Sequence, residues 1–283
     1  MYIYLKRIVD LGNVLWRKII DLYLKNPYDH IYLVYDLLYE WSNIDVVIDY
    51  DLAIKSYRLY WKGPYFDSII LWSNDICPDV EEMISKDLLD KLRPNSVIHL
   101  LNNSDRRCID KIVEYFEKNN WVVDKAVFYD MVVDEENFKP YEPDQAHRLT
   151  LDDLDAFIEI KKHQFREYEY GVEINKESAI ELLRKRRYYG VFVDSELVAI
   201  ACRYVGLPEI GVVGDVYVHP DHRGRGYGKI VTSAITRDVV GYGAKALLHV
   251  MKTNEVAIRL YEKLGYKIMG EKTWLFLEEK KGK

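Results

Sequence analysis

The most informative part of this chain is the stretch Val218-His219-Pro220-Asp221-His222-Arg223-Gly224-Arg225-Gly226-Tyr227-Gly228-Lys229. A β-branched run from Val212 to Val218 predicts a strand before it, and a helix is expected to begin near Lys229. The three alternating glycines between them allow positive φ angles and a close approach of the backbone to a ligand. The first amides of a helix lack intrahelical partners, and this end of the helix favours an anion. The stretch therefore predicts a concavity that binds a pyrophosphate.

The spacing of the glycines shows which of the known phosphate-binding patterns this stretch fits. A dinucleotide fingerprint requires Gly-x-Gly-x-x-Gly, but the third position after Gly226 is Lys229. A Walker loop requires Gly-x-x-x-x-Gly-Lys-Ser/Thr, which Arg223 and Ile230 break. The pattern that fits is Arg/Gln-x-x-Gly-x-Gly/Ala, filled by Arg223, Gly226 and Gly228. It resembles the coenzyme A pyrophosphate loop of the GNAT acetyltransferase superfamily.

A second segment strengthens this resemblance. Ala246 to Val250 predicts a buried strand, and a helix follows with Thr253 or Asn254 as its N-cap and Gly265 just beyond its end. The pattern Asn-x-x-Ala-x-x-x-Tyr-x-x-x-Gly-aromatic, which ends at Tyr266, is similar to the second signature of the superfamily. Both patterns stand in the family's order. The C-terminal half is therefore identified as a member of the GNAT superfamily.

Length and composition limit the alternatives. The chain has 283 residues, which suits two domains, and 49% of them are hydrophobic, enough for packed cores. The formal net charge of −6 predicts no general affinity for nucleic acid or for an anionic membrane. No apolar run approaches the roughly 20 residues of a membrane span, and the first residues lack the pattern of a secretory signal.

The three cysteines, Cys77, Cys108 and Cys202, are far apart and odd in number. We expect neither a disulfide framework nor a metal site from them, and this usage favours a reducing, cytoplasmic location.

The N-terminal half repeats the second part of the order of elements expected in the C-terminal half. The expected elements are a strand at Phe66–Trp72, a helix at Val80–Leu92, a strand at Ser96–Leu101, a helix at Arg106–Lys118 and either a strand pair or one long strand at Trp121–Val133. We therefore predict an α/β (α+β type) fold class with two GNAT-like domains, each a mixed, mostly antiparallel sheet flanked by helices.

The N-terminal copy lacks the features that bind the cofactor. Phe116 aligns with Tyr261, and residues 73–79 contain two acids and no glycine, so a pyrophosphate would be repelled. We predict a degenerate GNAT-like domain over residues 1–137, without a coenzyme A loop, and a catalytic domain over 138–283. A last strand, Trp274 to Leu277, is expected to close the second domain.

The resemblance implies which residues contact acetyl-CoA, the implied cofactor. In the family, pantetheine lies between two splayed parallel strands and pairs with the backbone of one of them. The expected contacts are Tyr217, Val218, Arg223, Gly224, Arg225, Gly226, Tyr227, Gly228, Lys229 and Asn254. The basic run Arg184–Arg187 is a candidate for the 3′-phosphate, although such helix ends are usually solvated. His219 and His222 flank the loop and are expected to face solvent.

The resemblance also implies catalytic roles. Tyr261 matches the family's general acid, and a phenol with a pKa of about 10 stays protonated at neutral pH and can protonate a thiolate. Asp215 stands where the family often places an acidic residue that serves as base, directly or through water; the alternative is a structural carboxylate. His249 is a second candidate for the base. A chain of water molecules without a dedicated base is a third possibility.

Acceptor recognition is expected in the segment that joins the first two helices of the second domain. Glu167, Tyr168 and Glu169 combine negative charge with an aromatic ring, which suits a cationic amine. The expected partner is thus an amine-bearing acceptor, either a small molecule or a peptide, with no nucleic acid and no membrane; a homodimer is left open.

These observations predict an acetyl-CoA-dependent N-acetyltransferase in which an amine attacks directly, without a covalent enzyme intermediate. The layout also resembles the glycine N-acyltransferase type, which pairs a degenerate N-terminal half with an active C-terminal half. A longer acyl group therefore stays open. The alternative functions are a non-catalytic sensor that binds acyl-CoA, and a scaffold.

Overall fold

The computed structural model describes residues 2–5, 11–74, 77, 79–101, 106–168 and 173–280. The chain forms two compact units: unit 1 comprises Met1–Phe128 and Glu271–Lys283, and unit 2 comprises Tyr129–Gly270. Among the described residues, no helix combines the length and hydropathy that a membrane span requires.

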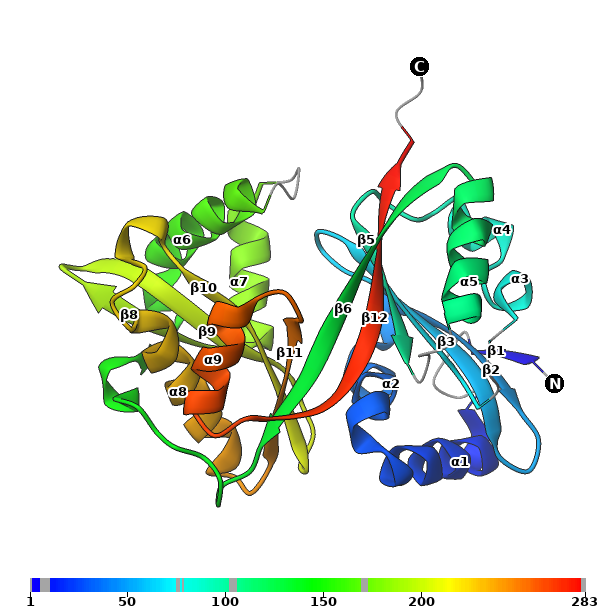
Figure 1. Ribbon diagram of the computed structural model, residues 1–283, viewed down its shortest axis with the longest axis horizontal. Helices are drawn as coiled ribbons and strands as arrows, with labels where there is room; N and C mark the ends of the chain where they lie inside the picture. The colour runs from blue at the N-terminus through cyan, green and yellow to red at the C-terminus, as the bar shows by residue number, and fades with distance from the viewer. Residues whose placement is uncertain are drawn as a thin grey trace. The chain divides into compact units, whose positions relative to one another are not determined.

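The same order of strands and helices occurs twice along the chain (Figure 1). The first series is β1 (Tyr2–Leu5), α1 (Gly12–Lys25), α2 (Pro27–Tyr39), β2 (Ile44–Tyr50), β3 (Ile54–Lys62), β4 (Asp67–Ser73), α3 (Val80–Met83), α4 (Lys86–Leu89), β5 (Ser96–Leu101), α5 (Arg106–Lys118) and β6 (Trp121–Val133). The second series is β7 (His147–Arg148), α6 (Leu154–Glu167), α7 (Lys176–Lys185), β8 (Arg187–Val193), β9 (Glu196–Gly206), β10 (Ile210–Val218), α8 (Tyr227–Val240), β11 (Lys245–Met251), α9 (Glu255–Lys263) and β12 (Lys267–Glu279). Short 3₁₀ turns include η4 (Leu151–Asp153) before α6 and η5 (Pro220–His222) before α8.

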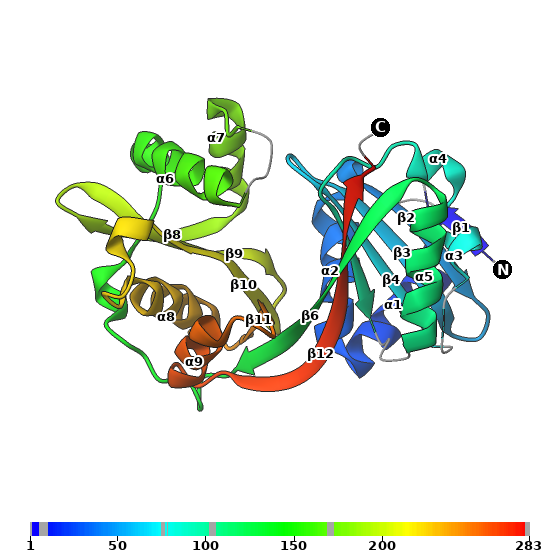
Figure 2. The ribbon, with the colours of Figure 1, turned by 45° about the horizontal axis from the view of Figure 1, so that its top comes forward.

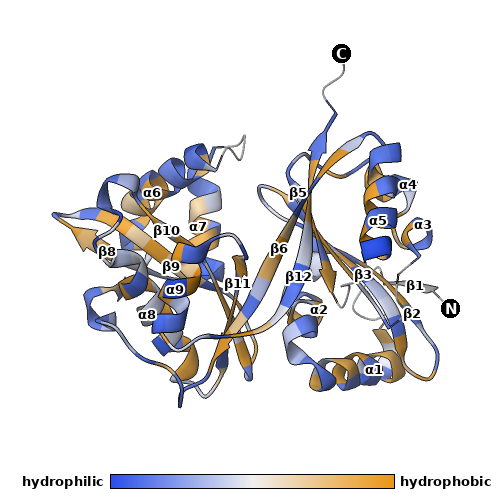
Figure 3. Ribbon diagram, viewed as in Figure 1, coloured by the Kyte–Doolittle hydropathy of each residue, from blue (hydrophilic) through white to orange (hydrophobic). Residues whose placement is uncertain are grey.

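The sheet of unit 1 is mixed and covered on both faces. Its strand order is β1-β2-β3-β4-β5-β12, and only the β4–β5 pair is parallel among the pairs described there. Helix α5 is amphipathic (Figure 3) and buries Cys108, Ile112 and Phe116 against one face. On the opposite face, His30 of α2 lies edge-on to Trp72 of β4, with ring centroids 4.9 Å apart.

The sheet of unit 2 has the order β7-β8-β9-β10-β11-β6, in which the pair β10–β11 is parallel and the described pairs from β7 to β10 are antiparallel. Helices α6 and α7 lie on one side of these strands and α8 and α9 on the other, as Figure 2 shows. Helix α8 is almost wholly apolar where it meets the sheet, with Val231, Ile235 and Val239 fully buried. This core fixes the start of α8 against the end of β10, which is where the candidate site lies.

The last strand of each series belongs to the sheet of the other. Residues 273–277 of β12 pair antiparallel with residues 96–100 of β5 in unit 1. In unit 2, β6 is the strand that stands next to β11. The expectation that Trp274–Leu277 closes the second domain is therefore wrong, because this segment completes the first sheet. The compact units also differ from the predicted division into 1–137 and 138–283.

Two further expectations for unit 1 need correction. The helix expected at Val80–Leu92 is two short helices, because Ser85 caps a new helix by accepting a hydrogen bond from the Leu88 amide. Cys77 and Cys108 form a disulfide bond, although the number and spacing of the cysteines suggested none. The third cysteine, Cys202, is free and buried.

Candidate functional site

Strand β10 bends away from β11 halfway along its length. The two strands pair only from Ile210 to Val212, opposite residues 245–247. The register of β10 against β9 then shifts between Gly214 and Tyr217, and Asp215 within this bulge has a φ of +54°. The parallel strands therefore separate before β10 ends, as the family resemblance implied.

The glycine-rich loop leads from the end of β10 to an open helix terminus. Gly224 and Gly226 have φ angles of +76° and +89°, which only glycine adopts without strain. Gly226 is the N-cap of α8, and no side chain caps this helix. Within the described residues, the backbone N–H groups of residues 224–228 donate no hydrogen bond. A Cβ atom at Gly224 would meet nothing within 4 Å, so the loop is open beside this residue. Unpaired amides at the start of a helix suit an anion.

Arg223 has a different environment from the one expected for a phosphate ligand. Its guanidinium forms an ion pair with Glu167 at 2.7 Å, and its Nε donates to the carbonyl of Val218 at 3.1 Å. The hydrogen bond to Glu167 raises the pKa of Arg223, and the same bond lowers the pKa of Glu167. Arg223 thus ties the loop to α6 and occupies the carbonyl that was expected to pair with pantetheine.

The residues predicted to recognise the acceptor differ in their surroundings. Glu167 also accepts a hydrogen bond from the Tyr217 hydroxyl at 2.9 Å, so its carboxylate is committed to the loop and to β10. Tyr168 is exposed at the end of α6, edge-on to Tyr217 with ring centroids 6.0 Å apart. Glu169 lies outside the described residues.

Other predicted cofactor contacts surround the loop. Lys229 lies over the ring of Tyr141, with its Nζ 3.1 Å from the ring centroid, and Arg225 is exposed. Asn254 accepts a hydrogen bond from the Ala257 amide and so caps α9, which explains its position without a ligand. Tyr227 and Gly228 form the first turn of α8.

The basic run at the end of α7 is largely engaged within the protein. Arg187 forms an ion pair with Asp238 at 2.8 Å, and the guanidinium of Arg186 lies over the ring of Tyr204. Lys185 pairs with Glu181 one turn earlier in the helix.

Tyr261 lies on α9 in the core of unit 2, with its side chain 7% exposed. Burial raises the pKa of its hydroxyl above the usual value, so the phenol is protonated across the neutral range. A protonated phenol is the state that a general acid requires. The neighbouring Tyr266, in contrast, shares a hydrogen bond with Thr236 at 2.7 Å and is structural.

The predicted base Asp215 is a fully engaged carboxylate. It accepts hydrogen bonds from Lys161, from Gln164 at 2.7 Å and from the Tyr188 hydroxyl at 2.6 Å. Burial alone would raise the pKa of Asp215, but the Lys161 ammonium and these hydrogen bonds lower it to about 2. A carboxyl group with so low a pKa is a poor proton acceptor near neutral pH. This network instead holds the bulge of β10, which matches the structural alternative.

His249, the second candidate for the base, has a carboxylate partner that the sequence did not reveal. Its Nδ1 lies 2.6 Å from Oδ1 of Asp130 on β6, and both side chains are about 95% buried. A buried carboxylate at this distance orients the imidazole.

The sequence also missed the partners of Asp215. Lys161 and Gln164 are buried on the face of α6 that carries Phe157 and Phe165. Polar residues on an otherwise apolar helical face were the available signal, because such groups need a partner inside the protein.

Comparisons with known proteins agree with this geometry. Residues 188–275 match the family model described as FR47-like protein. A solved structure from Drosophila superposes with a TM-score of 0.71 at 15% identity and covers 99% of each chain. A GCN5-related N-acetyltransferase-like protein from Streptococcus suis has a TM-score of 0.57 at 15% identity, covering 84% of this chain and 90% of its own.

A tandem GNAT protein from the clavulanic acid biosynthesis pathway has a TM-score of 0.51 at 12% identity, with 90% of this chain and 89% of that chain covered. No curated protein sequence matches this chain. The solved structures share the fold over both series of elements, and the FR47-like match covers β8 to β12. Residues 188–275 thus match the FR47-like family, and the chain as a whole has the fold of the solved tandem GNAT structure.

Proposed function

We propose that unit 2 is an acyl-CoA-dependent N-acyltransferase that uses acetyl-CoA and an amine acceptor. The observation that carries this proposal is the row of unpaired backbone N–H groups at residues 224–228, beside the point where β10 leaves β11. Unpaired amides at a helix N-terminus suit a pyrophosphate, and a gap between parallel strands suits an extended pantetheine chain.

The residues present fit the cofactor. The open space at Gly224 and the positive φ angles of the loop leave room for phosphate oxygens against the backbone. Arg225 is exposed beside these amides and supplies a positive charge. Arg223 would give up the Val218 carbonyl when pantetheine pairs with β10, while its ion pair with Glu167 can persist.

The bound cofactor would supply an activated acyl thioester to the amine. In the proposal, Tyr261 donates its hydroxyl proton to the departing sulfur, because burial keeps the phenol protonated. Asp215 is a positioning residue that keeps β10 bent through its bonds to Lys161, Gln164 and Tyr188. The ammonium proton of the acceptor leaves to water or to His249, which Asp130 orients.

The first test is calorimetric titration of acetyl-CoA into the full chain, followed by measurement of thiol release with a panel of amines. We expect one binding site per chain, and release of coenzyme A that depends on the amine. Binding without release for any amine would favour the sensor. Absence of binding would overturn the proposal.

The acyl chain length is tested in the same assay. Titration with acyl-CoA thioesters of increasing length compares the two forms of the proposal, acetyl transfer and transfer of a longer acyl group. The thioester with the highest kcat/KM identifies the donor, and the amine that gives this value identifies the acceptor class.

A further inference from the structure

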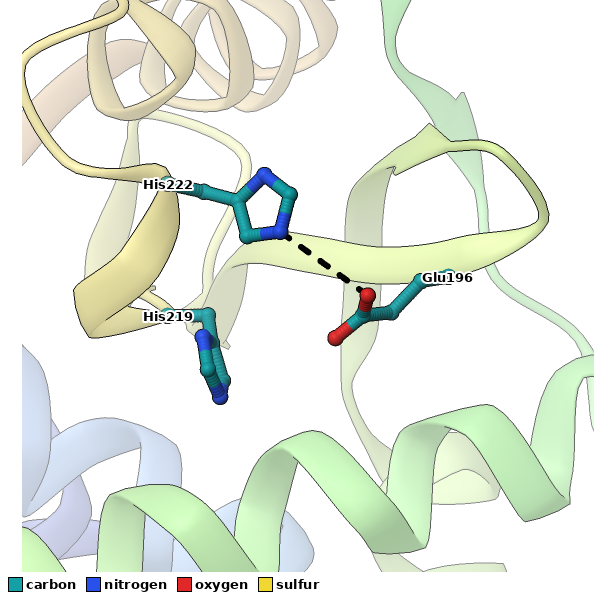
Figure 4. A group of neighbouring side chains, drawn as sticks. All are labelled: Glu196, His219 and His222. Atoms are coloured by element: carbon teal, nitrogen blue, oxygen red, sulfur yellow. Dashed lines mark ion pairs between the residues drawn. The ribbon is translucent and has the colours of Figure 1, made fainter.

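A cluster of three side chains lies at the entrance to the glycine-rich loop, and no part of the acyl-transfer proposal uses it. It comprises Glu196 at the start of β9, His219 directly before η5, and His222 at the end of η5 (Figure 4). One ligand atom from each residue lies within 4.8 Å of the others. Both histidines were expected to face solvent, yet their side chains are only 12% and 16% exposed.

The backbone fixes these three positions relative to one another. The turn before β9 has positive φ angles at Asp194 and Ser195, so Glu196 starts the strand directly after a tight hairpin. His219 donates its backbone N–H to the carbonyl of Val198 at 2.8 Å, and His222 donates to the carbonyl of His219 at 2.9 Å. The antiparallel pairing of β9 with β10 therefore brings Glu196 opposite the two histidines.

The spacing within the cluster suits ligands of one cation better than direct hydrogen bonds. His222 Nε2 lies 3.8 Å from Oε2 of Glu196, which is too long for a hydrogen bond. Two ligands that are each about 2.1 Å from a tetrahedral zinc ion stand about 3.4 Å apart. Small rotations of the exposed Glu196 side chain would bring the carboxylate to this distance.

We propose that Glu196, His219 and His222 form a binding site for a divalent transition-metal ion, with Zn²⁺ as the best fit. Two imidazoles and one carboxylate are a ligand set that zinc accepts, and water fills the fourth tetrahedral position. The ion would join the β8–β9 hairpin to the turn that precedes Arg223. Mg²⁺ and Ca²⁺ are not expected to bind, because they prefer oxygen ligands.

The test is calorimetric titration of Zn²⁺ into the full chain after removal of metal with a chelator. We expect one zinc ion per chain, and a loss of affinity of about ten-fold or more in Glu196→Gln and in His222→Asn. His147→Asn is the matched control, since His147 is exposed, stacks on Phe192 and is not one of the three ligands, and it should retain wild-type affinity. Glu196 is exposed, so Glu196→Gln tests the site without disturbing the core.

A crystal soaked with zinc gives an independent result. An anomalous peak about 2.1 Å from the three ligand atoms would support the site. The proposal is overturned if zinc does not bind, if the anomalous peak lies elsewhere, or if Glu196→Gln and His222→Asn both bind zinc as tightly as the wild type.

Discussion

Units 1 and 2 have the same order of elements but differ at the position where a cofactor would enter. In unit 1, β4 pairs with β5 along residues 68–72 without a break, and its pairing with β3 shows no register shift. In unit 2, β10 pairs with β11 only along residues 210–212 and carries a bulge at Asp215. Because β4 is paired on both sides, its backbone N–H and C=O groups are not available to an extended ligand. The part of β10 that has left β11 can offer such groups.

The segments that follow β4 and β10 also differ in whether they leave backbone amides free. After β10 come two glycines with positive φ angles and an uncapped helix. After β4, Cys77 is joined by a disulfide to Cys108 of α5, and Asp79 caps α3 with its own side chain. A covalent bond and a capped helix thus stand where the other unit offers free amides. Under the proposed function, a bulge and a short glycine pattern, rather than the arrangement of strands and helices, would make the difference between a unit that binds coenzyme A and one that does not.

The largest effect is expected from Gly226→Glu, which should make the loop of unit 2 as unfavourable for phosphate binding as the corresponding segment of unit 1. A side chain at a φ of +89° is strained, and the added carboxylate repels phosphate, so acetyl-CoA affinity should fall about 1,000-fold, or about 4 kcal/mol. The matched control is Gly243→Glu at the other end of α8, which has a φ of +79° and should bind normally. Equal affinity in wild type and Gly226→Glu, measured by calorimetry, would refute the role of the loop.

The second effect concerns the disulfide of unit 1. Removing it in the double variant Cys77→Ser, Cys108→Ser should destabilise unit 1 by about 3 kcal/mol, because the bond closes a loop with a sequence separation of 31. All six tryptophans lie in unit 1, so tryptophan fluorescence during urea unfolding follows this unit alone. Acetyl-CoA affinity should stay unchanged. A variant in which binding is lost, or in which the fluorescence transition does not move, would contradict this assignment.

The third effect is catalytic. Tyr261→Phe should lower kcat about 100-fold and leave KM nearly unchanged, because the hydroxyl acts only as the thiolate departs. Tyr266→Phe removes a neighbouring buried hydroxyl that bonds Thr236, and it should reduce stability by about 1 kcal/mol without a comparable loss of kcat. If both variants keep the wild-type kcat, Tyr261 is not the general acid. Its ring would then only pack in the core of unit 2, as Phe116 does in unit 1.

The smallest effect is the pH dependence of the bulge. The pKa of Asp215 is lowered to about 2 in the folded protein, so its stabilising contribution is present above the unfolded pKa of about 4 and is lost as the pH falls towards 2. The destabilisation caused by Asp215→Asn should therefore shrink by about 2 kcal/mol between pH 5 and pH 2, as measured by urea unfolding with circular dichroism. Asp221→Asn is the control variant, because it removes an exposed carboxylate that lies outside this network. A destabilisation by Asp215→Asn that does not depend on pH would show that Lys161 does not set this pKa.

Local signals predicted much of the fold and of the loop. The strand Ser96–Leu101, the helix Arg106–Lys118 and the strand Trp121–Val133 lie where periodicity placed them. The glycine spacing located Gly224 and Gly226 in an open turn, because positive φ angles depend on the residue itself.

Features that depend on distant partners could not be predicted in this way. The bonds of Asp215 to Lys161 and Tyr188 span 54 and 27 residues, and the pairing of Cys77 with Cys108 spans 31. Alternation of apolar residues shows that Trp274–Leu277 is a strand, but it does not say which neighbour the strand takes. The sequence therefore places Asp215 in its strand, but only the folded chain shows that Lys161 and Tyr188 bind its carboxylate.

The exchange of β6 and β12 has a consequence for synthesis on the ribosome. A domain usually folds once its own residues have emerged, and the N-terminal domain does so first. Here the edge of β5 stays open until residues 273–277 have been translated, since β12 supplies its partner. Unit 1 must therefore wait, with an unpaired strand edge that could bind other chains, while all of unit 2 is made. The half that lacks a cofactor loop is the last to be completed, although it is the first to be translated.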